Sequence, residues 1–285
     1  MPTAILFIIC SVVLFAVMDG ISKLLTGDYS IAQVVWARYA FAVPVVLATA
    51  RPAAWPRLLR CERPALQAGR SLLPVLANTT AVVALSLMPL ADATAITFMH
   101  PLLVVALSAP LLGERLSAQG WIGVVVGFAG VLTIVRPGAG AIAWAALFPL
   151  ATAFLFALYQ VLTRLVSRED APVVTLAWTI AVGLVATSAV LPFSWHGVSG
   201  GDWALLILSG LLFGAGQFFL IRAFAMAPGA VLAPFTYVQI VAAMVFGMLV
   251  FGEVPDSWTF LGMTLIVLAG IYVLRRQVEP ERAGA

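Results

Sequence analysis

Ten apolar runs of about twenty residues, separated by short polar or turn-forming segments, follow one another along the chain. An α-helix needs a run of this length to cross a bilayer. The separators contain turn residues such as Gly27-Asp28, Pro137-Gly138 and Gly200-Gly201, and none is long enough for a folded soluble domain. The pattern predicts an all-α integral membrane protein with ten transmembrane helices. They cover residues 3–25, 32–50, 67–88, 92–112, 118–136, 142–166, 173–193, 203–226, 230–251 and 257–275.

The segment from Pro89 to Gly123 recurs 139 positions later, from Pro228 to Gly262. Gly113-Glu114 matches Gly252-Glu253 at the same offset, and Phe15-Ala16 and Lys23 match Phe156-Ala157 and Arg164 at an offset of 141. We therefore expect two five-helix repeats, residues 1–138 and 139–285. Because five is odd, the second repeat crosses the membrane in the opposite sense, which makes an inverted repeat of the kind used in alternating access. Chance similarity between apolar helices is the alternative, but it does not explain why the Gly, Pro and Glu positions keep their register.

Composition and charge support a membrane location. The chain is 63 % hydrophobic and 9 % charged, which excludes a soluble domain of this length. Its net charge of +3 comes from a few loop clusters, so a nucleic-acid partner is not expected. The positive-inside rule predicts that both termini are cytoplasmic. The charges that this orientation places inside are Arg51, Arg57, Arg60, Arg63, Arg70, Arg115, Arg164, Arg168, Arg275, Arg276 and Arg282.

Several motifs carry a family resemblance: Arg38 in VVWARYAFA, Pro101, Gly113-Glu114-Arg115, and a helix with Gly123, Gly127 and Gly130. They resemble those of the drug/metabolite transporter superfamily, EamA type. The resemblance implies two five-helix repeats and a secondary transporter in the bacterial inner membrane, with no enzyme activity and no cofactor. Ile240 stands where the partner of Pro101 would be, so a proline-dependent bend need not recur in the second repeat.

Within this superfamily the chain most resembles the bacterial aromatic amino-acid exporters of the YddG branch. That likeness rests on overall similarity and an aromatic-rich interior. It implies export of aromatic and other neutral amino acids from the cytoplasm. Export of other metabolites or drugs is the alternative.

Polar side chains near the middle of the predicted helices are candidates for substrate binding, because such groups are costly in hydrocarbon unless they face a cavity or a partner. These residues are Asn78, Thr79, His100, Gln217 and Gln239. Asn78 matches Gln217, and His100 matches Gln239, at the repeat offset of 139. Such symmetric pairs are expected of a central site on the pseudo-two-fold axis. Alternatively, the amides tie neighbouring helices together by hydrogen bonds.

Aromatic residues at similar depth offer flat apolar faces with polar tips, which suit an amphiphilic substrate such as Phe or Trp. The candidates are Trp36, Phe98, Tyr159, Trp178 and Tyr237. Packing within the core is the alternative role for each of them.

Asp19 and Arg38 are the strongly charged residues that lie well inside predicted helices, each about six residues from the outer end. Their equal depth predicts an ion pair, because an unpaired charge there would be expensive. The pair is either an outer gate or a purely structural clamp. For Glu114 and Glu253, which end equivalent helices, we expect a structural role such as capping the next helix.

Other functional classes lack support in the sequence. No metal-binding or catalytic constellation is found, and the absence of a Walker motif excludes direct use of ATP. A channel or a helper subunit remains an alternative.

Asp19 and His100 are the intramembrane groups to test for proton coupling, although facilitated diffusion fits as well. The small residues at Gly123, Gly127 and Gly262 suit either close internal packing or a homodimer.

Overall fold

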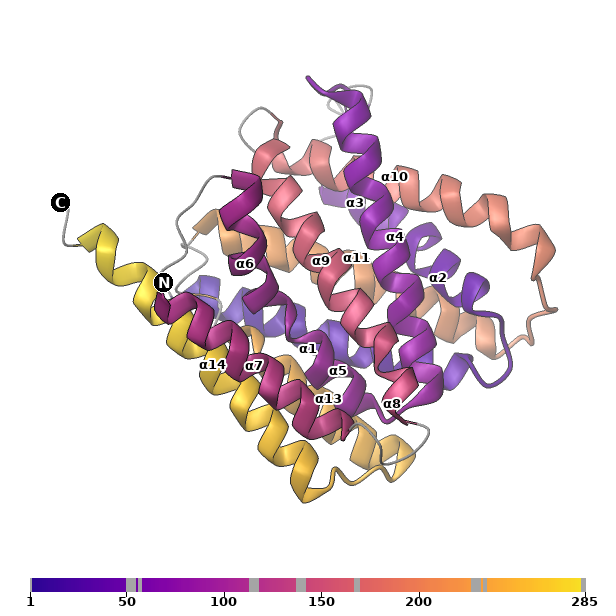
Figure 1. The fold of residues 1–285 in the computed structure, drawn as a ribbon. Helices are drawn as coiled ribbons and strands as arrows, with labels where there is room; N and C mark the ends of the chain where they lie inside the picture. The colour runs from indigo at the N-terminus through magenta and orange to yellow at the C-terminus, as the bar shows by residue number, and fades with distance from the viewer. Residues whose placement is uncertain are drawn as a thin grey trace.

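The computed structural model describes residues 2–49, 55, 58–112, 118–136, 142–166, 170–226, 232 and 235–282. Within these ranges the regular structure is entirely helical (Figure 1). The first part contains α1 (Pro2–Leu25), α2 (Ile31–Ala40), α3 (Val43–Thr49), α4 (Pro64–Leu87), α5 (Leu90–Thr97), α6 (His100–Leu112) and α7 (Ala118–Val135). The second contains α8 (Ile142–Ala145), α9 (Leu147–Val166), α10 (Pro172–Val190), η2 (Leu191–Phe193), α11 (Asp202–Met226), α13 (Val238–Phe246), η3 (Gly247–Phe251) and α14 (Ser257–Arg282).

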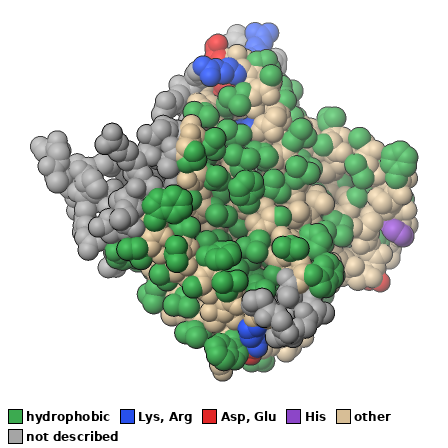
Figure 2. All heavy atoms as spheres, in the orientation of Figure 1, with side chains coloured by type: hydrophobic (Ala, Val, Ile, Leu, Met, Phe, Trp, Pro, Cys, Tyr) green, Lys and Arg blue, Asp and Glu red, His purple; other side chains and the backbone are tan. Residues whose placement is uncertain are grey.

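Five of the described helical segments are long and apolar enough to cross a membrane: Pro2–Leu25, Ile31–Thr49, Pro64–Leu87, Val173–Phe193 and Asp202–Leu220. Shorter apolar segments are Leu90–Val104, Trp121–Val135, Leu147–Thr163, Val238–Phe251 and Ser257–Val273. Large apolar side chains on these helices face outward, with Leu249 81 % and Val185 70 % exposed. Figure 2 shows hydrophobic side chains over most of one face, with charged groups toward its upper and lower edges. This surface suits hydrocarbon and would be a liability in water.

Several of the expected continuous helices are interrupted, and two of the interruptions lie at equivalent positions in the two halves. The segment predicted over 92–112 is divided into α5 and α6 at Phe98 and Met99, just before Pro101, which has no backbone N–H to donate. In the second half, α13 begins only at Val238, after a turn at Tyr237, the residue 139 positions beyond Phe98. The interruption therefore recurs although Ile240 replaces the proline, so it does not depend on proline at that position.

Helices from the two halves pack against each other in pairs: α1 on α11, α4 on α9, and α7 on α14. The helices α7 and α14 lie side by side in Figure 1 and run antiparallel, because Gly123 faces Ala269 while Gly130 faces Gly262. A Cβ added at Gly130 would lie 2.9 Å from the Gly262 carbonyl oxygen. The small residues of α7 thus allow close packing within the chain.

The buried apolar residues form two main clusters. One joins α5, α6, α7, α13 and α14, and the other joins α1, α2, α10 and α11. A set of polar side chains from α1, α2 and α4 lies where these clusters approach each other.

Candidate functional site

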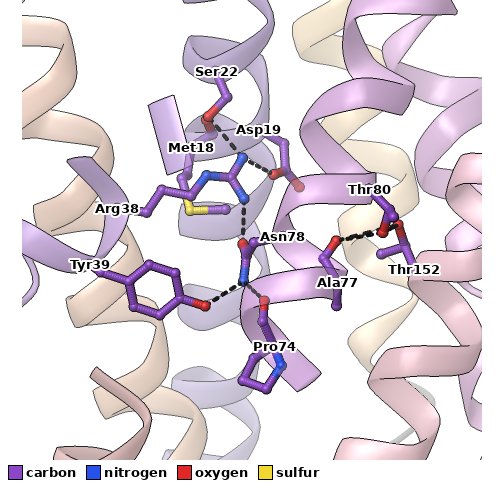
Figure 3. A network of polar contacts seen from close by, with 10 residues as sticks. All are labelled: Met18, Asp19, Ser22, Arg38, Tyr39, Pro74, Ala77, Asn78, Thr80 and Thr152. Carbon is purple, nitrogen blue, oxygen red and sulfur yellow. Dashed lines mark hydrogen bonds and ion pairs between the residues drawn. The ribbon is translucent and has the colours of Figure 1, made fainter. Parts of the chain in front are cut away.

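Arg38 connects three helices through its guanidinium group (Figure 3). Its Nη2 donates to Asp19 Oδ1 at 2.9 Å and to Ser22 Oγ at 2.8 Å, both on α1. Its Nη1 donates to Asn78 Oδ1 on α4 at 2.7 Å. The Arg38 side chain is 1 % exposed, and its Nε has no hydrogen-bond partner among the described residues. The ion pair predicted from equal depth is therefore present, and Asn78 is a third member that the sequence did not place beside it.

Asn78 is fully engaged in this network. Besides accepting from Arg38, its Nδ2 donates to the Tyr39 hydroxyl at 3.2 Å and to the Pro74 carbonyl at 2.8 Å (Figure 3). The bond to Tyr39 reaches α2, and the bond to Pro74 satisfies a carbonyl within α4. In this structure Asn78 ties helices together, as in the alternative considered for it.

A small cavity lies beside the ion pair, between α1, α4, α5 and α13. Its polar lining consists of Asp19, Thr94, Thr97 and Gln239, and its apolar lining of Ala81, Ala84, Leu85, Ala93 and Phe98. The cavity volume is about 50 Å³. This is well below the roughly 300–1,000 Å³ typical of pockets that enclose a small-molecule ligand. In the present arrangement the cavity has room for a small polar group but not for a whole metabolite.

A row of aromatic rings leads away from this cavity. Ring centroids are 5.5 Å apart for Tyr237 and Phe98, 5.3 Å for Phe98 and His100, 5.6 Å for His100 and Phe156, and 5.7 Å for Phe156 and Tyr159. The row brings four of the predicted residues together, and His100 Nδ1 lies 3.1 Å from the Thr97 carbonyl oxygen. Phe156, which matches Phe15 in the repeat, is a member of the row that the sequence did not predict.

The far end of the row meets a second buried guanidinium group. The Arg70 Cζ atom lies 4.9 Å from the centre of the Tyr159 ring. Arg70 is fully buried within α4, which corrects its predicted place among the positive charges of an inside loop. Its Nη1 donates to Thr163 Oγ1 at 2.8 Å, and its Nη2 to Thr179 Oγ1 at 2.8 Å and to the Thr175 carbonyl at 3.0 Å.

This Arg70 cluster joins α4 to α9 and α10. Gln67, one turn before Arg70, accepts from its Nε and donates to Asp170 Oδ2 at 2.7 Å. The sequence contained one signal for this cluster: Gln67 and Arg70 are three residues apart at the start of a predicted helix, and residues at that spacing share a helix face.

One end of the bundle is closed by Lys23, at the end of α1. Its Nζ forms an ion pair with Glu253 and donates to the Met88 carbonyl at 2.9 Å. Glu253 Oε2 accepts from the Leu90 backbone N–H at 2.9 Å, so the residue caps α5 and not the helix that follows it. The expectation that Glu253 caps the next helix is thus corrected. Its counterpart Glu114 lies outside the described residues.

The other predicted site residues lie away from the cavity or are occupied by local bonds. Trp36 Nε1 donates to Ser188 Oγ at 3.0 Å, and Trp178 Nε1 donates to the Leu59 carbonyl at 3.2 Å. The Thr79 hydroxyl donates to the Val75 carbonyl within α4. Gln217 is 8 % exposed, and its side chain forms no hydrogen bond with the other described residues.

Comparisons with known proteins identify similar transporters. A riboflavin transporter of Rhizobium johnstonii is 28 % identical over 228 residues, which cover 80 % of this chain and 76 % of the relative. An S-adenosylmethionine uptake transporter of Rickettsia prowazekii is 25 % identical over 274 residues, covering 95 % and 92 %. A pseudopaline exporter of Pseudomonas aeruginosa is 31 % identical over 267 residues, covering 92 % of each chain.

A solved crystal structure shares the fold, with a TM-score of 0.67 at 20 % sequence identity, over 98 % of this chain and 99 % of that one. The model of the EamA-like transporter family matches the chain twice, over residues 2–136 and 143–276. The two matches together cover nearly the whole sequence, and the chain therefore belongs to the EamA-like transporter family.

Proposed function

We propose that this protein is a ten-helix secondary transporter whose halves, residues 1–138 and 139–285, are related by an inverted repeat and expose a shared site alternately. Equivalent hydrogen bonds in the two halves support the repeat. Ser11 Oγ donates to the Gly216 carbonyl at 2.8 Å, and Thr152 Oγ1 donates to the Ala77 carbonyl at 3.4 Å. Thr152 stands 141 positions after Ser11, and Gly216 stands 139 after Ala77, so each bond is the counterpart of the other.

Contacts between equivalent residues indicate where the axis would lie. Phe98 and Tyr237 are 139 positions apart, and their rings are in contact at 5.5 Å. A pseudo-two-fold axis that passes between them would lie beside the polar cavity. The antiparallel packing of α7 on α14 also agrees with halves of opposite orientation. We place both termini in the cytoplasm, as the positive-inside rule predicts. The ion pair of Lys23 and Glu253 then lies at the outer end of the helices.

For the substrate, we propose a small metabolite with a planar ring and a polar end, with aromatic and other neutral amino acids as the first class to test. One observation carries this proposal: the row of rings from Phe98 to Tyr159 begins at a largely apolar cavity that also presents the polar side chains of Asp19, Thr94, Thr97 and Gln239. The relatives named for riboflavin and for S-adenosylmethionine carry molecules with planar heteroaromatic rings. A wider range of ring-bearing metabolites is therefore the second candidate.

The direction of transport is proposed to be export from the cytoplasm across the bacterial inner membrane. The relatives have names for both uptake and export, so direction needs its own measurement. Transport also requires the halves to separate, because the cavity of about 50 Å³ is too small to enclose such a substrate.

The test is transport in liposomes that contain the purified protein. Uptake of labelled Trp, Phe and Thr is measured with and without a pH gradient, alongside labelled riboflavin and S-adenosylmethionine, and with the orientation of the protein determined. Saturable flux of an aromatic amino acid that excess unlabelled Phe inhibits would support the proposal. Flux of riboflavin or S-adenosylmethionine alone would favour the second candidate, and no flux above protein-free liposomes would reject both.

A further inference from the structure

The Asp19 carboxylate uses only one of its two oxygens within the described part of the chain. Oδ1 accepts from Arg38, while the second oxygen points away from the guanidinium group (Figure 3). The Asp19 side chain is 18 % exposed, in contrast to 1 % for Arg38. Because Asp19 lines the cavity between α1, α4, α5 and α13, a carboxylate oxygen is available there to accept a hydrogen bond.

Neutral polar groups surround the same space. Thr94 is 6 % exposed, and neither its hydroxyl nor the Gln239 amide has a hydrogen-bond partner among the described residues. The Thr97 hydroxyl donates to the Ala93 carbonyl at 2.9 Å, which leaves its oxygen as an acceptor toward the cavity. Buried polar groups are normally paired, so the buried Thr94 hydroxyl and the half-buried Gln239 amide are free to pair with a ligand or with water that enters the cavity.

We infer that this cavity is the subsite for the ammonium group of the transported molecule. This inference rests on the proposed transport of amino acids. An ammonium group brings three donors and no acceptor, and the cavity offers oxygens from Asp19, Thr94, Thr97 and Gln239. The cavity volume of about 50 Å³ accommodates this group while the rest of the substrate lies outside.

The position of Phe98 connects this subsite to the ring of the substrate. Phe98 lines the cavity and also begins the aromatic row with His100 and Phe156. A substrate with its ammonium group at Asp19 would therefore place its side chain toward these rings.

The ion pair with Arg38 should give the subsite only a moderate affinity for an ammonium group. In the empty protein Arg38 compensates the Asp19 charge, so no carboxylate is left unpaired in the low-dielectric interior. An arriving ammonium group shares a carboxylate that is already half-engaged. It is thus held loosely enough to leave on the other side of the membrane.

The experiment compares three probes that differ only in their charged groups: Phe, 3-phenylpropionate, which lacks the amine, and phenethylamine, which lacks the carboxylate. Their affinities for the purified protein are measured by calorimetry in detergent. In wild type, Phe and phenethylamine bind more tightly than 3-phenylpropionate. In Asp19→Asn, affinity for both amines falls roughly tenfold or more, as expected for a charged hydrogen bond, while that for 3-phenylpropionate changes by less than about threefold.

Two further variants separate binding from folding. Gln239→Leu and Thr94→Val leave the bonds of Arg38 intact, and each should weaken the two amines selectively. If Asp19→Asn fails to fold, these two variants test the ammonium subsite in its place. Asp28→Asn, in an exposed turn, is the matched control for loss of a carboxylate and should bind all three probes as wild type does.

The outcomes distinguish this inference from the proposed function. If wild type binds Phe but none of the three cavity variants reduces its preference for amines, the subsite is rejected and amino-acid transport stands. If only phenethylamine binds, and binding depends on Asp19, the subsite stands and the amino-acid proposal fails. If wild type binds none of the probes, both are rejected.

Discussion

Replacing Asp19 with leucine would remove the carboxylate of the buried ion pair and leave the Arg38 guanidinium bonded only to Ser22 and Asn78. Arg38 is 1 % exposed, so its charge cannot reach water without movement of a helix. Breaking a buried pair by removing one partner costs about 3–5 kcal/mol. Because Asp19 is 18 % exposed, the lower end of this range, about 3 kcal/mol, is expected.

Arg38→Met should cost at least as much, because it removes bonds to three side chains and leaves Asp19 without its cation. The double variant removes both charges, so it should be milder than the sum of the two single variants by about 2 kcal/mol. The assay is reversible unfolding in mixed micelles with increasing sodium dodecyl sulfate, read by circular dichroism and analysed as a double-mutant cycle.

The hydroxyls of Thr80 and Thr152, 2.8 Å apart, provide a matched control pair without charge. Thr80→Val and Thr152→Val should show a coupling of only about 0.6 kcal/mol, the average for polar contacts between membrane helices. If the effects of Asp19→Leu and Arg38→Met add to within about 0.5 kcal/mol, the two residues are not energetic partners and the reasoning is refuted.

Three further predictions concern other contacts. Lys23→Met should accelerate hydrogen exchange at the start of α5, because Glu253 loses its cation while it caps Leu90; unchanged exchange would show that Lys23 does not hold this end closed. Gly262→Ala should destabilise the protein by about 1–3 kcal/mol in the micelle assay, because the new Cβ would lie 2.6 Å from a carbonyl oxygen of α7, whereas Gly200→Ala, in open space, serves as the control with little expected effect. The Thr259 backbone N–H and the Arg136 side chain lower the pKa of Asp256 below 3.8, so the stability that Asp256 contributes is present at neutral pH and lost as pH falls through that lowered pKa. The difference in stability between Asp256→Asn and wild type, measured from pH 7 to pH 2, should therefore shrink as the pH falls below 3.8, and a constant difference would contradict this assignment.

Much of the architecture was predictable because it depends on local pattern. The apolar runs, the turn residues between them and the recurring Gly, Pro and Glu positions identify the helices and the two matching halves without any knowledge of packing. The pairing of Asp19 with Arg38 was also predictable, since two opposite charges at equal depth in hydrocarbon have few other partners. The ten-helix count and the inverted relation remain predictions that these patterns support.

Tertiary structure decided which face each helix presents and therefore what each polar residue contacts. Asn78 matches Gln217 in the repeat, yet it bonds to Arg38 and Tyr39 while Gln217 forms no such bond among the described residues. Arg70 was predicted to be a charge in an inside loop, but it is buried against Tyr159. The sequence by itself determined that the chain is an apolar helical protein made of two similar segments, because the length of apolar runs and a repeated residue pattern can be read without knowledge of packing. Only the packed structure brought Asp19, Thr94 and Gln239 to one cavity, because their meeting depends on the rotation and tilt of α1, α5 and α13, which contacts distant in the chain decide.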